Sequence, residues 1–66
     1  MKRTYTRESV VQIITNVLEF EVGTRDLYEE YLDRLSDAKV RNVFRLLMDE
    51  EVQHVESIQA ILELIR

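Results

Sequence analysis

The sequence predicts an all-α protein, and its composition and its apolar pattern both support this. The 66 residues contain no proline and a single glycine, Gly23. Proline breaks helices and glycine weakens them, so this composition allows long, uninterrupted helices. Apolar residues also recur at intervals of three and four along the chain. That spacing places side chains on one face of a helix, and we therefore expect helices and no strands.

The first helix is expected over residues 7–35. Thr6 can cap its N-terminus, because a threonine hydroxyl accepts a hydrogen bond from an N–H of the first turn. Glu8 lies in that first turn, where a negative charge is favourable.

The second helix is expected over residues 38–65. It follows the break "LSDA", in which either Ser36 or Asp37 can serve as the N-cap. A connection this short makes neighbouring helices antiparallel. The predicted fold is therefore an antiparallel two-helix hairpin, a single domain over residues 1–66.

The length and the charge of the chain limit its partners. Sixty-six residues are near the lower limit for a self-sufficient core, and no cysteine is present to form a disulfide or a thiolate metal site. One hairpin has two broad apolar faces, so we expect two copies to dimerise into a four-helix bundle. The net charge of −4 and the lack of a long apolar run argue against nucleic acid and membrane partners. We expect a cytoplasmic homodimer or higher homo-oligomer.

Ionisable residues interrupt the apolar seam of each helix at one common height. In steps of four and three, the second helix is apolar except at Glu51 and His54, and the first is charged only at Glu21. Both glutamates lie about 15 residues from the turn, or roughly 22 Å at a rise of 1.5 Å per residue. His54 is one turn beyond Glu51 on the same face. The predicted seams are Val10, Ile14, Val17, Glu21, Thr24, Tyr28, Tyr31 and Leu35, then Val40, Phe44, Leu47, Glu51, His54, Ile58, Ile61 and Ile65.

Carboxylates in an apolar seam need compensation, because burying each one alone costs several kcal/mol. In a two-fold dimer, four glutamates and two histidines would meet at this height, and two divalent cations would balance the four negative charges. Oxygen and imidazole ligands without sulfur suit Fe or Mn, and Zn less decisively. We therefore expect Glu21, Glu51 and His54 to be metal ligands.

These residues resemble the ferritin-like di-iron superfamily, most closely the encapsulated ferritins and the ferritin-like domain of rubrerythrins. The similarity lies in Glu21, in Tyr28 seven residues later, and in "EEVQH", which holds Glu51 and His54. It implies a ferritin-like four-helix bundle with Glu21 and Glu51 as iron ligands, one of them bridging, and His54 as a terminal ligand. Tyr28 would hydrogen-bond a ligand carboxylate or supply an electron.

The activity implied by the resemblance is ferroxidase-type oxidation of Fe(II) by dioxygen or peroxide. Each dimer would bind two Fe ions, and Mn or Zn would be the substitutes. Encapsulated ferritins also have a third helix and a C-terminal cargo peptide, and neither follows the second helix here, so docking into an encapsulin shell is not expected. Rubrerythrins use a cysteine-ligated iron for electron delivery, which this cysteine-free chain cannot supply.

Each of these residues also has an interpretation without metal. Glu21 can form a surface ion pair with Arg25 one turn later. His54 can be a core histidine, and Tyr28 can be a packing residue. The alternative function is a structural or interaction module, a helical-hairpin dimer whose buried polar layer sets the register of the helices.

Overall fold

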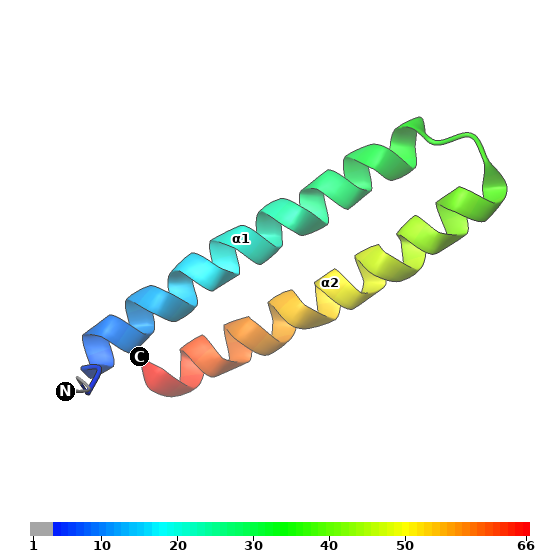
Figure 1. Cartoon of the computed structure of the whole chain (residues 1–66). Coiled ribbons are helices and arrows are strands. Elements are labelled where there is room, and N and C mark those ends of the chain that lie inside the picture. The colour runs from blue at the N-terminus through cyan, green and yellow to red at the C-terminus, as the bar shows by residue number, and fades with distance from the viewer. Residues whose placement is uncertain (1–3) are drawn as a thin grey trace.

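The structure, a computed structural model, describes residues 4–66. Helix α1 spans Arg7–Arg34 and helix α2 spans Ala38–Ile65, and the two pack side by side in opposite directions (Figure 1). This confirms the all-helical hairpin, with helix bounds within one residue of the predicted ranges. Neither helix combines the length and the apolar character that crossing a membrane would require.

Side chains at the helix N-termini satisfy backbone groups that a helix leaves unpaired. The Thr6 hydroxyl accepts a hydrogen bond from the Ser9 N–H at 3.1 Å. The Asp37 carboxylate accepts one from the Val40 N–H at 3.0 Å. Asp37, and not Ser36, is therefore the N-cap of α2.

Two arginines tie the helix ends together. The half-buried Arg41 donates hydrogen bonds to the carbonyl oxygens of Leu32 and Leu35, the second at 2.9 Å, at the end of α1. At the other end of the hairpin, Arg7 donates to the carbonyl oxygen of Ile65 at 2.6 Å. These carbonyls have no partner within their own helices. The two contacts hold both ends of α1 against α2 and so support the axial register that the short turn between the helices allows.

The observed seam differs from the predicted one at every second position. Val55 and Leu62 are the most buried residues, at 3% and 5% exposure, whereas the predicted seam residues Val40 and Ile61 are 40% and 45% exposed. The apolar arc of α2 is wide enough to contain both rows, so the pattern alone did not decide which row faces α1. The observed seam comprises Val11, Ile14, Leu18, Glu21, Arg25, Tyr28, Leu32 and Leu35, then Arg41, Phe44, Met48, Glu51, Val55, Ile58, Leu62 and Ile65.

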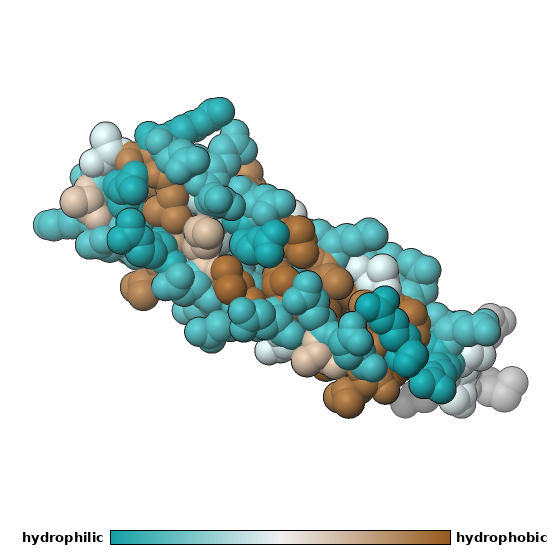
Figure 2. Space-filling view, turned by 180° about the vertical axis from the view of Figure 1, so that it is seen from behind, coloured by the Kyte–Doolittle hydropathy of each residue, from teal (hydrophilic) through white to brown (hydrophobic). Residues whose placement is uncertain are grey.

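The displaced predicted positions line one side of the hairpin, which we call the open face. Tyr31 packs edge-on against Phe44, with ring centroids 5.9 Å apart, and His54 lies beside Glu21, so both displaced rows open on the same side. Apolar side chains also reach the molecular surface along much of the hairpin in the view of Figure 2. The open face consists of Val10, Val17, Thr24 and Tyr31 of α1, and Val40, Leu47, His54 and Ile61 of α2.

Replacing the N-cap should show which residue starts α2. We expect Asp37→Ala to lower the free energy of unfolding by about 1 kcal/mol, because the Val40 N–H loses its acceptor. The neighbouring Ser36→Ala is the matched control and should change it by less than about 0.5 kcal/mol. Urea unfolding followed by circular dichroism measures both. Equal losses in the two variants would contradict the assignment of the cap.

Candidate metal centre

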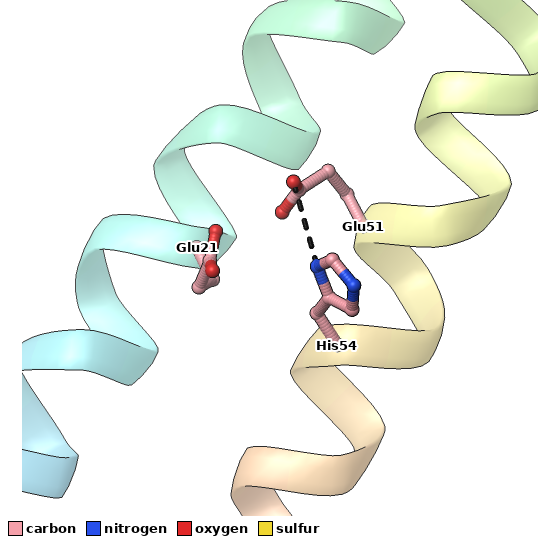
Figure 3. Close-up of side chains that lie close together, drawn as sticks. All are labelled: Glu21, Glu51 and His54. Carbon is pink, nitrogen blue, oxygen red and sulfur yellow. Dashed lines mark ion pairs between the residues drawn. The ribbon is translucent and has the colours of Figure 1, made fainter.

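Three ionisable side chains meet at mid-length between the helices. Glu21 projects from α1, while Glu51 and His54 project from consecutive turns of α2 (Figure 3). One ligand atom from each residue lies within 4.8 Å of the other two. The structure thus brings together the three residues that the sequence predicts as metal ligands.

The three residues differ in exposure because they occupy different rows of their helices. Glu51 lies in the seam, and only 15% of its side chain is exposed. His54 lies in the open face and is 57% exposed, with its Nδ1 atom 3.6 Å from Glu51 Oε1. Within one hairpin, His54 is therefore a surface residue and not a buried core histidine. Its imidazole borders the glutamates from the open face.

Glu51 is the electrostatically unusual member of the cluster. Its Oε2 atom is buried and has no hydrogen-bond partner among the described residues. Burial raises the pKa of the Glu51 carboxyl, a hydrogen bond and the negative charge of Glu21 raise it further, and His54 opposes the shift. A carboxylate has no proton to donate, so Oε2 lacks a donor as long as Glu21 and Glu51 are both ionised. A proton retained by Glu51 or a bound cation would each give this oxygen a partner.

The residues around the cluster bear on the remaining interpretations. Arg25 pairs with Asp26, with 3.1 Å between Nη2 and Oδ1, and not with Glu21. Tyr28 packs edge-on against Phe44 at a centroid distance of 5.9 Å, as a packing residue would. Its predicted hydrogen bond to a ligand carboxylate stays a prediction.

Sequence reasoning missed Arg41, which positions the site without touching it. By holding the end of α1 to the start of α2, Arg41 supports the register in which Glu21 is level with Glu51. A signal was present, because Arg41, Met48 and Val55 are spaced by seven residues and form a row of the observed seam. The predicted seam instead contains Val40.

The chain matches no protein-family model, no curated protein and no solved structure. The similarity to ferritin-like proteins therefore rests on Glu21, Tyr28, Glu51 and His54 and on their spacing. The function that this similarity implies is carried forward as a proposal.

The raised pKa of Glu51 predicts how the stability of the metal-free protein depends on pH. The folded state keeps the proton to a higher pH than the unfolded chain, in which the pKa is near 4.5. Between these two pKa values, the free energy of unfolding should fall as pH rises. Glu51→Gln removes this titration, so the variant should show a flatter pH profile and be more stable than the wild type above the window.

Urea unfolding in the presence of chelator, across a pH series from below 4.5 upward, measures this effect. The exposed Glu56→Gln on the same helix is the matched control and should follow the wild-type profile. Parallel profiles for Glu51→Gln and the wild type would refute a proton held by this pair.

Proposed function

We propose that the protein is an iron-binding, ferritin-like homodimer that oxidises Fe(II) at a di-iron centre formed between two hairpins. The observation that carries the proposal is the convergence of Glu21, Glu51 and His54 within 4.8 Å around a buried oxygen that has no partner. Two carboxylates and an imidazole, without sulfur, suit Fe and Mn best and also accept Zn.

The charges of the cluster favour a pair of divalent ions. Each hairpin contributes the carboxylates of Glu21 and Glu51, so a dimer contributes four negative charges that two divalent ions would balance. A cation would also compete with the proton that the raised pKa of Glu51 favours, and it would give Oε2 a partner. Three donors from one hairpin leave coordination positions open. A second hairpin on the open face would supply the remaining ligands.

The iron pair, when bound, supplies electrons, with dioxygen or peroxide as the acceptor. The chain holds and orients the ions. Glu51 is fixed in the seam and Glu21 faces it across the helix contact, so both carboxylates have defined positions. His54 approaches from the open face. Tyr28 lies on the same face of α1 as Glu21, two turns away. As the resemblance implies, it would hydrogen-bond a ligand carboxylate or donate an electron.

A structural module is the second candidate, and the raised pKa of Glu51 favours it. A proton held by Glu51 would let it donate to Glu21 and would give a polar layer that needs no metal. Such a layer can fix the register of packed helices at some cost in stability. Glu51→Leu separates the two functions. If the layer is purely structural, this variant should be more stable and lose no bound metal.

Metal binding should stabilise the fold, because the unfolded chain has no assembled site. We expect the thermal midpoint to rise with Zn(II), Mn(II) or anaerobic Fe(II) and to fall again with chelator. A metal at about 100 times its dissociation constant adds about 2.7 kcal/mol to the free energy of unfolding. Superimposable melting curves with metal and with chelator would contradict the proposal that this site binds metal.

Variants should separate ligands from neighbouring residues. We expect Glu51→Ala and His54→Ala to lose bound metal, because each removes a donor atom. Tyr28→Phe should keep the metal and slow the oxidation of Fe(II), since it removes only a hydroxyl. Elemental analysis per chain and the absorbance of Fe(III) measure the two properties. The exposed Gln53→Ala, beside His54, is the control for both, and metal loss in Tyr28→Phe equal to that in Glu51→Ala would contradict these roles.

A further inference from the structure

The hairpin exposes more surface than a compact protein of its mass. Its accessible surface is 5541 Å², and its mass is 7.9 kDa. A compact monomer of this mass exposes about 4,400 Å², so the excess is about 1,100 Å². A stable dimer interface takes about 800 Å² or more from each partner. The excess therefore matches the share that one chain contributes to a dimer.

Apolar residues extend beyond the open face on α1 but not at the centre of α2. Ile13, Phe20 and Leu27 are spaced by seven residues and are 41%, 73% and 43% exposed. We call them the α1 stripe. Each lies three residues after a member of the open face, and is therefore its neighbour on the helix surface. The equivalent row of α2 is Val43, Glu50, Ser57 and Leu64, which is polar at mid-length.

A two-fold axis can bring two open faces together in two ways. If the axis runs along the helices, α1 packs on the partner's α2 and the two turns lie at the same end. Phe20 of the α1 stripe then faces the polar row that contains Glu50 and Ser57. If the axis runs across the helices, α1 packs on the partner's α1 and the turns lie at opposite ends. The α1 stripe then packs against its own copy.

We propose that a second copy of this chain covers the open face with α1 antiparallel to the partner's α1 and with the two turns at opposite ends. This pairing rests on the dimer of the proposed function and adds its geometry. It buries the apolar α1 stripe against apolar residues and leaves Glu50 at the rim of the interface. The other arrangement would place Phe20 beside charged and polar side chains.

The height of the site agrees with this pairing. Helix α1 is capped at both ends, by Thr6 and Leu35, and the midpoint of Arg7–Arg34 falls between Phe20 and Glu21. An axis across the helices crosses α1 at one height and places the partner's α1 antiparallel to it. If the two copies of α1 overlap along their full length, the axis crosses α1 at its midpoint. The axis then passes at the height of Glu21, bringing the two Glu21–Glu51–His54 clusters together. An axis along the helices would bring the two clusters to a common height wherever they lay on the hairpin, so it does not explain their position at mid-length.

Side-chain sizes also match after this reversal. Residues equally distant from the midpoint come opposite one another, so the large Tyr31 faces the partner's smaller Val10. Large residues opposite small ones let layers interdigitate without voids. In the arrangement with both turns at one end, Tyr31 and Phe44 of the two copies would crowd the same end of the bundle.

Single spin labels test the geometry, because the chain has no native cysteine to label by mistake. In Ser36→Cys the label sits on the turn, and we expect the two labels of a dimer to be separated by about the 51 Å length of the hairpin. Turns at the same end would instead give a separation near its 24 Å width. Gln53→Cys, at mid-length on the outer side, is the control and should give a short separation in either dimer. Dipolar spectroscopy with diamagnetic Zn(II), and again with chelator, measures the distances.

The outcomes distinguish the pairing from the metal site. A short turn-to-turn distance would overturn the pairing and leave the metal proposal standing. The long distance without any Zn(II) binding would support the pairing and remove the metal site. Absence of dipolar coupling between the labels at both positions would show that no dimer forms, and it would overturn both proposals.

A pair of charge variants tests the surface itself. Phe20→Glu should raise the dimer dissociation constant by about a hundredfold or more, because it places like charges together at the centre of the α1 contact. Leu46→Glu is the matched control, since Leu46 is 65% exposed but lies away from both the open face and the α1 stripe. It should leave dimerisation unchanged. Sedimentation at a series of concentrations measures both, and an intact Phe20→Glu dimer would overturn the pairing.

Discussion

A carboxylate oxygen without a donor, placed where two helices touch, is the constraint on which the rest of this structure depends. Glu51 Oε2 is buried and unpartnered, and Glu21 brings a second carboxylate to the same point. This meeting requires a fixed register, because a slip of one helical turn would separate the two groups by about 5.4 Å. Arg7 and Arg41, at opposite ends of the hairpin, hold that register. Contacts at the helix ends thus help to keep Glu21 and Glu51 together at mid-length.

The site and the unfinished core lie on the same side of the molecule. Among the described residues only Val55 and Leu62 are buried apolar residues, and the residues of the open face that borders Glu51 are half-buried or exposed. A second copy on the open face would therefore complete the core and the ligand set in one event. Metal affinity and dimer affinity would then be linked, because each would favour the same assembled state. A change in one affinity would then change the other.

The sequence predicted those features that local chemistry decides. The lack of proline and the spacing of apolar residues were sufficient for two helices, and Thr6 was sufficient for the start of α1. The common height of Glu21 and Glu51 followed from counting residues back from the turn, and the structure places the two side by side.

The inward row of α2 could not be predicted in the same way. Its apolar arc carries Val40 and Ile61 beside Val55 and Leu62, and tertiary packing chooses between the two rows. Arg41 also interrupts the apolar pattern of the observed seam, because a charged residue occupies this position and donates hydrogen bonds to the end of α1. The choice between Ser36 and Asp37 as N-cap likewise depends on turn geometry that either residue type allows.

The position of His54 bears on what the polar layer is for. A residue whose only task was to set the register of α1 against α2 would lie in the seam, as Glu51 does. His54 lies one row outward and is 57% exposed, and its closest charged contact within the hairpin is Glu51 at 3.6 Å. The hairpin alone gains little from such a weak, solvated contact. The imidazole is instead placed where the open face meets the two carboxylates. There the imidazole could bind an ion or contact a second copy of the chain. The proposed ferritin-like centre would put an ion on that side, and the proposed α1 pairing would put a second copy there.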